Sequence, residues 1–350
     1  MVGIALLGAG IFASQEHLPA IEADPSLELK AVYSRSQKSA ETLASASKNA
    51  SSVDVYYDSP AVAGKSLDDL LRRDDIAAVA VVLPILTQPA VIQKAIKAGK
   101  HVLSEKPVAA DVDAAKKLIS WYDSLGAGAP IWAVAENFRF IESLDYAATK
   151  VAGFGGKVAT FRLQKYGFVR AEDKYFNTAW RKVPEHQGGF LLDGGVHFVA
   201  ALRLLLAAAG QEIKQLACFS ALLEERLLPV DTVNAVAVTQ DGKSGTITMT
   251  FGTEFKSGLE IEVVTTSGAV AWTPTSVRTV TNNSASGERV EDTKEFLYSS
   301  GVKEEMVAFS QAIGAGKANP LQTPAEALKD LEILQGLLKS GEGNAALTQI

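Results

Sequence analysis

Short apolar runs alternate with stretches of helical pattern along the first part of the chain. The runs that favour strands lie at 2–7, 27–33, 77–83, 101–106 and 131–135. The stretches at 87–98 and 111–122 have the apolar spacing of helices, and Gly99 ends the first of them. Strands that alternate with helices pair in parallel through right-handed crossovers. The pattern therefore predicts a doubly wound α/β domain, which we assign to residues 1–125.

The second part of the chain has longer alternating runs. Strands are predicted at 157–166, 232–239, 245–251 and 259–265, with glycine and aspartate turns between several of them. Helices are predicted at 189–206, 303–313 and 324–338. We therefore expect residues 126–350 to form an α+β domain with a large, mostly antiparallel sheet, which binds substrate and forms the dimer contact. The last helix is a candidate for packing against the first domain.

Composition excludes several classes of protein. The chain has 350 residues, of which 47% are hydrophobic and 21% charged, so it is expected to be globular and long enough for two domains. Its net charge of −6, without any dense basic run, argues against a nucleic-acid partner. We expect no membrane segment or signal peptide, because the N-terminal apolar run has no cationic leader and is broken by glycines.

A single cysteine bears on redox compartment and metal binding. Cys218 lies among apolar residues, and with no second thiol it cannot form an internal disulfide or build a cysteine-rich zinc site. We therefore expect a reducing compartment, with the cytoplasm as the default location, and no bound metal.

A glycine loop follows the first predicted strand. The sequence Gly8-Ala9-Gly10-Ile11-Phe12-Ala13 stands between that strand and a predicted helix. In a dinucleotide-binding loop, the first glycine makes a tight turn, the second lets the backbone approach a pyrophosphate, and a small third residue allows helix and strand to pack closely. The N–H groups of the first helical turn, which includes Ile11 and Phe12, then face the phosphates.

The end of the second predicted strand indicates which dinucleotide is bound. A carboxylate normally stands there to hold the ribose 2′-hydroxyl of NAD, but this chain has Ser34-Arg35-Ser36. An arginine between two hydroxyls attracts a 2′-phosphate, so we expect NADP(H) to be preferred over NAD(H). Lys38, in the following helix, is a further candidate. The alternative is an ordinary polar turn.

A lysine stands at the end of the strand predicted at 101–106. Pro107 lacks a backbone N–H and disfavours helical geometry at Lys106, so the strand is expected to stop here and present the lysine. Taken alone, the sequence Glu105-Lys106-Pro107 is equally compatible with a solvated pair of charges at an ordinary turn. The glycine loop favours the other interpretation, because open α/β sheets bind ligands at the carboxyl ends of their strands.

A second chemical feature lies in the helix predicted at 189–206. Asp193 and His197 are four residues apart and so share one face of the helix. Two such side chains can converge on a substrate alcohol. The alternatives are a surface ion pair or a core histidine with satisfied hydrogen bonds.

Four blocks of sequence together resemble the glucose-fructose oxidoreductase, inositol dehydrogenase and rhizopine-catabolism (Gfo/Idh/MocA) family of NAD(P)-dependent oxidoreductases. They are the glycine loop, the block at 98–107, Glu136-Asn137-Phe138-Arg139-Phe140, and Asp193-Gly194-Gly195-Val196-His197. The segment at 175–190 looks most like a fungal cytosolic branch. Two segments depart from the family pattern. The family commonly has Thr-Pro-Asn in place of Leu83-Pro84-Ile85 and His in place of Gln88, and many members have an acid in place of Ala200.

The resemblance implies an NADP(H)-dependent oxidoreductase that acts on a sugar, a polyol or a related hydroxy or carbonyl compound. It implies catalytic roles for Lys106, His197 and Asp193, with lysine and histidine interchangeable as the main acid/base. The further candidates for contacting cofactor are Leu83, Pro84, Glu105, Pro107, Asn137, Trp180 and Arg181. The alternative is a catalytically silent NADP(H)-sensing regulator. In either case we expect a homodimer or higher homo-oligomer through the C-terminal sheet.

Overall fold

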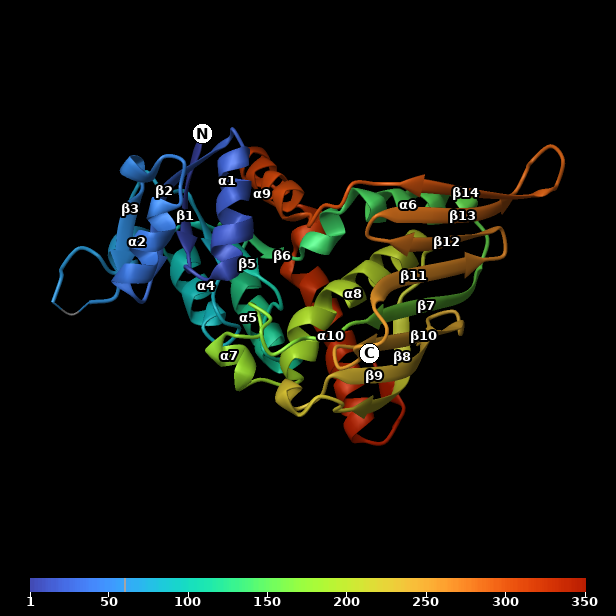
Figure 1. The fold of residues 1–350 in the computed structure, drawn as a ribbon. Coiled ribbons are helices and arrows are strands. Elements are labelled where there is room, and N and C mark those ends of the chain that lie inside the picture. The colour runs from blue at the N-terminus through green and yellow to red at the C-terminus, as the bar shows by residue number, and fades with distance from the viewer. Residues whose placement is uncertain (60) are drawn as a thin grey trace. The chain divides into compact units, whose positions relative to one another are not determined.

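The chain divides into two compact units (Figure 1). The computed structural model describes residues 1–59 and 61–350. Met1–Glu136 and Val302–Leu328 form the first unit, and Asn137–Gly301 and Lys329–Ile350 form the second. The expected boundary between residues 125 and 126 precedes β6 (Trp132–Ala135), which pairs in parallel with β5 (His101–Glu105) and so continues the first sheet.

The first unit contains a six-stranded parallel sheet, which confirms the predicted doubly wound domain, although β3 is not among the five strands predicted. The order is β3-β2-β1-β4-β5-β6. The remaining strands are β1 (Val2–Leu7), β2 (Leu27–Ser34), β3 (Asp54–Tyr57) and β4 (Ala78–Val81). The direction of winding reverses between β1 and β4, and such a switch point at the carboxyl ends of the strands is where doubly wound folds bind ligands.

Helices pack on this sheet, and one comes from far along the chain. Those from the N-terminal segment are the π-helical turn η1 (Ala13–His17), α1 (Leu18–Ala23), α2 (Gln37–Ser45), the 3₁₀ turn η2 (Ala50–Ser52), α3 (Leu67–Leu71), α4 (Gln88–Lys97) and α5 (Val112–Asp123). The distant one is α9 (Val302–Ala315), which is followed by η5 (Pro320–Gln322). Met306 and Phe309 of α9 lie in the same hydrophobic cluster as Ile4, and Ser310 donates a hydrogen bond to Asp24.

The helix that joins the first unit is therefore mainly α9 rather than the last one. Of α10 (Pro324–Glu342), only the first residues, up to Leu328, belong to the first unit. The reason is the apolar face of α9, whose Val302 and Ala312 also enter the first hydrophobic cluster.

The second unit is built on a nine-stranded sheet. Its order is β14-β13-β12-β11-β7-β10-β9-β8-β15, and neighbours run antiparallel except β7 and β10. The strands are β7 (Val158–Tyr166), β8 (Ile213–Ala221), β9 (Thr232–Thr239), β10 (Ser244–Thr250), β11 (Gly258–Thr265), β12 (Gly268–Thr273), β13 (Ser276–Asn282), β14 (Arg289–Glu295) and β15 (Thr348–Gln349). This confirms the predicted mostly antiparallel sheet.

One face of this sheet is covered by helices. The helical segments are η3 (Asn137–Phe140), α6 (Glu142–Phe154), α7 (Ala179–Lys182), α8 (Gly189–Ala208) and η4 (Glu225–Leu227), together with most of α10. Along β9, Val233, Ala235 and Ala237 are buried whereas Asn234 and Val236 are exposed. Such alternation is the mark of a sheet with one face packed and the other open.

Helix α8 is the central helix of the second unit. It is long and apolar enough to cross a membrane, but 67% of its most apolar window is buried inside the protein. It also carries a buried aspartate, Asp193. Its apolar character is thus explained by burial on the sheet.

Candidate functional site

The glycine loop has the geometry that a dinucleotide requires. Gly8 has φ +116°, and a Cβ atom there would lie 2.0 Å from the carbonyl oxygen of Val82, so only glycine fits. A Cβ atom on Gly10 would meet no protein atom within 4 Å, which leaves space for a ligand to approach the backbone. Ala13 is fully buried, as close packing of helix and strand demands. The first unit therefore fits the predicted cofactor at its switch point.

The first helical turn follows the loop directly. The backbone N–H of Ser14 donates to the carbonyl of Gly10 (3.1 Å), and the half-buried Ile11 and Phe12 lie within this turn. The N–H group of Ile11 lies at the start of this helix, where no preceding helical turn supplies a carbonyl acceptor. A phosphate is a suitable acceptor for such groups.

The turn after β2 presents an exposed arginine. Ser36 caps α2, because its hydroxyl accepts a hydrogen bond from the Ser39 amide (3.4 Å), while Arg35 and Lys38 are exposed and Ser34 is half-buried. The turn thus offers cations where the sequence predicts a 2′-phosphate.

A carboxylate that the sequence analysis did not consider lies at the same sheet edge. Asp58 follows Tyr57, the residue that pairs with Ser34, and accepts a hydrogen bond from the hydroxyl of Tyr33 (2.8 Å). Burial, together with Asp58, raises the pKa of Tyr33, so the phenol remains a donor. Only the pairing of β2 with β3 could reveal Asp58, because it stands more than twenty residues beyond the arginine turn.

The residues after β4 combine apolar packing with one buried polar group. Leu83 lies beside the loop, since a Cβ on Gly8 would be 3.3 Å from its side chain, and both Leu83 and Pro84 are half-buried. Gln88, the first residue of α4, is 2% exposed, and within 1–59 and 61–350 its Oε1 has no hydrogen-bond partner. A polar acceptor is thus present where the family pattern has histidine.

Lys106 lies where the sequence predicts it. Strand β5 ends at Glu105, and Lys106 follows, half-buried and joined to a buried Pro107 by a cis peptide bond. Glu105 is itself buried, and its Oε1 lies 2.6 Å from Nε2 of His17. The lysine is thus presented at the carboxyl end of a strand next to the switch point.

Helix α8 confirms that Asp193 and His197 share a helical face, and the structure adds partners for both. Asp193 is buried and accepts a hydrogen bond from Nε of Arg181 (2.8 Å). The guanidinium of Arg181 stacks 4.0 Å from the centre of the Trp180 ring. His197 is half-buried and stacks on Phe138, with ring centres 4.8 Å apart. The second unit thus gathers Asp193, Arg181 and Trp180 into one cluster.

The block at Glu136–Phe140 has a structural role in its own unit. The side-chain amide of Asn137 donates to the carbonyl of Ser300 (2.6 Å). Arg139 and Arg203 both donate to Asp330, which is completely buried in α10. These contacts join segments that lie far apart in the sequence.

Two further titratable side chains lie in the second unit, and the sequence analysis did not single them out. The His186 ring is 6.1 Å from that of Trp180, and burial lowers its pKa, while a hydrogen bond to the Gly189 backbone and the charge of Asp193 act in the opposite direction. Nζ of Lys165 is 5.5 Å from the centre of the Phe198 ring, and burial lowers its pKa. Lys165 lies on the covered face of β7, two residues after Leu163. This spacing is the sequence signal that could have indicated its partial burial.

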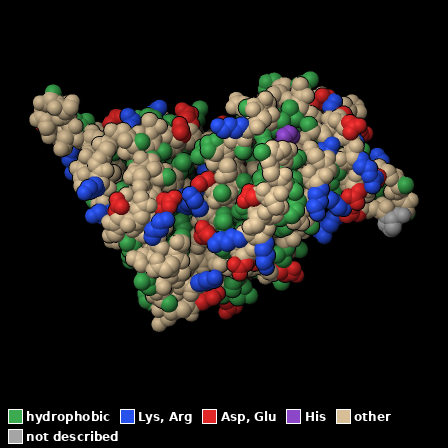
Figure 2. Space-filling view, turned by 180° about the vertical axis from the view of Figure 1, so that it is seen from behind, with side chains coloured by type: hydrophobic (Ala, Val, Ile, Leu, Met, Phe, Trp, Pro, Cys, Tyr) green, Lys and Arg blue, Asp and Glu red, His purple; other side chains and the backbone are tan. Residues whose placement is uncertain are grey.

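Charge is dispersed over the face of the molecule that Figure 2 shows. Figure 2 shows one face of the molecule, on which Lys and Arg side chains are interspersed with Asp and Glu. Across the described part of the chain, no group of three or more His, Cys, Asp or Glu side chains is arranged to hold a metal ion.

Comparison with known proteins assigns the family. Residues 2–128 match the oxidoreductase family with an NAD-binding Rossmann fold, and residues 151–271 match the GFO/IDH/MocA C-terminal domain. The chain is 56% identical over 340 residues to Dehydrogenase FPY6 of Fusarium mangiferae. The aligned region covers 97% of this chain and 96% of that protein. The chain belongs to the Gfo/Idh/MocA family.

Solved structures of other proteins agree with the fold of this oxidoreductase. An oxidoreductase from Thermotoga maritima superposes with a TM-score of 0.83 at 28% identity, covering 97% of this chain and 96% of the other. KijD10, a 3-ketoreductase from Actinomadura kijaniata in complex with NADP and TDP-benzene, superposes with a TM-score of 0.74 at 22% identity, covering 97% of each chain. As a member of this family, the protein is a dehydrogenase or reductase with a nicotinamide cofactor.

Proposed function

We propose that this oxidoreductase uses NADP(H), in preference to NAD(H), to interconvert a hydroxyl and a carbonyl group on a sugar, a polyol or a related compound. The observation that carries the proposal is Lys106, a half-buried lysine at the carboxyl end of β5, beside the switch point of a sheet whose glycine loop leaves open space at Gly10. A sensor that had lost catalysis would have no need for a lysine there.

A nicotinamide bound at the glycine loop would supply the hydride chemistry, and the side chains of this protein must then hold or move one proton on the reacting oxygen. We assign the role of main acid/base to His197, because histidine is the side chain that most often transfers protons in catalysis. Lys106 hydrogen-bonds and polarises the oxygen. The reverse assignment of these two roles is the alternative. Asp193, held by Arg181, positions the substrate.

The second unit favours a neutral, polyhydroxylated substrate. The charge of Arg181 is balanced by Asp193, so this pair adds no net cation that would call for an anionic substrate. Trp180 and Phe138 supply aromatic surface next to Arg181 and His197, respectively. Aromatic surface with a few fixed polar groups is typical of small-molecule sites.

Replacement of Lys106 tests the catalytic part of the proposal. Lys106→Met is expected to lower kcat by about 10²–10⁴-fold in a screen of sugars and polyols, with the NADPH dissociation constant changed only a few-fold. Lys117→Met, at an exposed position of α5, is the matched control and should leave kcat unchanged. Undiminished turnover by Lys106→Met would overturn the role of the lysine. Tight NADPH binding by the wild-type protein without turnover of any substrate would favour the sensor.

Paired substitutions at the β2 edge test the cofactor preference. Arg35→Ala is expected to raise the NADPH dissociation constant about tenfold or more and to leave that for NADH almost unchanged, because only NADPH carries a 2′-phosphate. Asp58→Asn removes a negative charge from the same edge and should strengthen NADPH binding. Fluorescence titration measures both constants. Tighter binding of NADH than NADPH by the wild-type protein would contradict the proposal.

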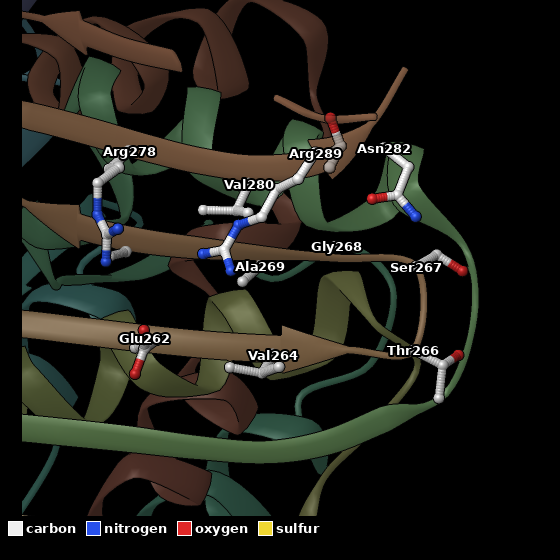
Figure 3. A pocket seen from close by; sticks show the side chains of 12 residues that line it. Glu262, Val264, Thr266, Ser267, Gly268, Ala269, Arg278, Val280, Asn282 and Arg289 are labelled. Atoms are coloured by element: carbon white, nitrogen blue, oxygen red, sulfur yellow. The ribbon is translucent and has the colours of Figure 1, made fainter. Parts of the chain in front are cut away.

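We also propose that the open face of the second sheet joins two copies of this chain in the cytoplasm. A pocket on this face is lined by β11 to β14, and Glu262, Arg278 and Arg289 extend over it (Figure 3). The face carries both signs of charge, with Arg162 paired to Glu260 on it, so a second copy turned about a twofold axis presents complementary groups. A homodimer or higher homo-oligomer would cover apolar residues such as Val236, which is 50% exposed.

Sedimentation analysis of two variants tests this assembly. Val236→Glu places a charge on the part of the open face that β9 contributes and is expected to shift the protein to monomer. Leu125→Glu, at a similarly exposed apolar residue of the first unit, is the control and should not alter the assembly. A monomeric wild-type protein at micromolar concentration would contradict the proposal.

A further inference from the structure

A histidine outside the predicted site contacts the residue next to Lys106. Nε2 of His17 lies 2.6 Å from Oε1 of Glu105, although the two residues are 88 positions apart in the sequence. His17 is 1% exposed and Glu105 is 9% exposed, so solvent does not screen the contact. The hydrogen bond links the helix after the glycine loop to the end of the strand that delivers the lysine.

Packing alone does not require this pair. Leu103, two residues before Glu105, lies on the same face of β5 and is buried in the apolar core. Leu18, the residue after His17, belongs to the same hydrophobic cluster. Two apolar side chains of similar size would fill the space without the cost of removing polar groups from water. A buried polar contact at this place therefore points to a demand for a defined geometry.

The surroundings of His17 indicate which form of the ring is present. Within residues 1–59 and 61–350, its buried Nδ1 has no hydrogen-bond partner. A protonated ring would leave a buried N–H donor at Nδ1 unsatisfied, which is costly, so we assign the neutral tautomer with its proton on Nε2. Nε2 of His17 then donates to the Glu105 carboxyl group. Phe12 packs edge-on against the ring at 5.4 Å and restricts its orientation.

The backbone around His17 is also unusual. The helix that follows the glycine loop is widened into a π-helix over Ala13–His17, and His17 is its last residue. Single π-helical turns inside α-helices are rare and occur frequently at functional sites. The local helix geometry therefore contributes to the position of the imidazole opposite Glu105.

We infer that His17 is a positioning residue for Lys106, because its hydrogen bond to Glu105 holds the end of β5 at the point where the lysine side chain leaves the strand. The inference rests on the proposed function of Lys106. Glu105 is the last residue of β5 and is bonded directly to Lys106, so a shift of its side chain moves the lysine backbone. Displacement of a catalytic group by about 1 Å can cost on the order of a hundredfold in rate.

Three variants test the inference. His17→Leu fills the cavity but cannot donate, and it is expected to lower kcat about ten- to a hundredfold with the NADPH dissociation constant within about threefold of wild type. His17→Gln keeps an N–H donor at similar reach and should recover most of kcat. His101→Leu is the matched control: it removes a half-buried histidine from the other end of β5, where Nδ1 accepts a hydrogen bond from the Ile131 amide (2.9 Å). It should lower the melting temperature and leave kcat unchanged.

A readout independent of turnover separates this inference from the proposed function. In protein labelled with ¹⁵N-lysine, the Nζ resonance of Lys106 is identified by its loss in Lys106→Met. We expect it to move in His17→Leu and to stay near its wild-type position in His17→Gln and His101→Leu. An unmoved resonance in His17→Leu would overturn the inference, as would a loss of kcat that His101→Leu reproduces. A moved resonance in a protein without turnover would support the inference and contradict the proposed function.

Discussion

The two units hold their candidate residues in different ways. In the first unit, Gly8 and Gly10 owe their positions to backbone geometry at the carboxyl end of β1. In the second unit, the side chains of Asp193 and Asn137 hydrogen-bond to other segments: Asp193 accepts from the Arg181 guanidinium, and Asn137 donates to the Ser300 backbone carbonyl. The first unit is organised by where strands end, and the second by which side chains meet.

This difference has consequences for substitution. A position that depends on backbone geometry tolerates changes only where space and φ allow, whatever the neighbouring side chains are. A position that depends on a buried charged partner fails when either member of the pair is removed, because the remaining charge is left uncompensated. The largest losses of stability are therefore expected for substitutions in the second unit. Substitutions in the first unit are expected to change cofactor affinity and stability independently of each other.

The largest effect is expected for Asp330 in the second unit. Asp330→Asn leaves Arg139, which is 4% exposed, and Arg203 without their buried counter-charge. We expect the free energy of unfolding to fall by about 3–5 kcal/mol, as measured by urea denaturation followed by intrinsic fluorescence. Asp292→Asn, on the exposed strand β14, is the control and should change it by less than about 0.5 kcal/mol. A loss below about 1 kcal/mol for Asp330→Asn would mean that this unit does not depend on its buried ion pairs.

Two glycines of the first unit are expected to separate stability from binding. Gly8→Ala forces a Cβ atom to within 2.0 Å of the Val82 oxygen at a φ of +116°, so the free energy of unfolding should fall by about 2 kcal/mol or more. Gly10→Ala meets no protein atom and should change it by less than about 0.5 kcal/mol, yet raise the NADPH dissociation constant at least about tenfold. Thermal unfolding and fluorescence titration measure the two effects. Equal losses of unfolding free energy in both variants would contradict the prediction that the open space at Gly10 accommodates a Cβ atom without loss of stability.

The smallest effect concerns pH. Burial lowers the pKa of His101, whose Nδ1 accepts the Ile131 N–H, so the folded protein binds a proton less readily than the unfolded chain, in which histidine titrates near 6.5. The contribution of this group to the free energy of unfolding is therefore fully present above about pH 6.5 and decreases as the pH falls toward the folded pKa. His101→Asn retains an acceptor without titrating and should flatten the profile of melting temperature between pH 7.5 and 5.5. An unchanged slope would contradict this assignment.

Most of the fold was predictable from local patterns. The parallel first sheet apart from β3, the mostly antiparallel character of the second sheet and helix α8 follow from the periodicity of apolar residues, which reflects burial on one or both faces. The position of α9 was not predictable in this way. Its apolar stripe shows only that one face is buried, and not that it is buried beside Ile4 in the first unit.

The residues of the candidate site likewise fall into those that local sequence could predict and those that depend on tertiary packing. The end of β5 before Lys106 and the glycine turn at Gly8 were readable because proline and glycine impose their backbone preferences wherever they stand. The pairing of Asp193 with Arg181, the hydrogen bond from His17 to Glu105, and the place of Asp58 beside the arginine turn were not readable.

The amino-acid sequence by itself thus determined the class of fold, the family, and the lysine at the end of β5, since each depends on residues that are neighbours in the chain. Which side chains hold that lysine and the α8 carboxylate in place emerged only in the folded protein. A hydrogen bond between residues 88 positions apart, such as that of His17 and Glu105, leaves no periodic trace, because its geometry depends on the packing of elements that are distant in the sequence.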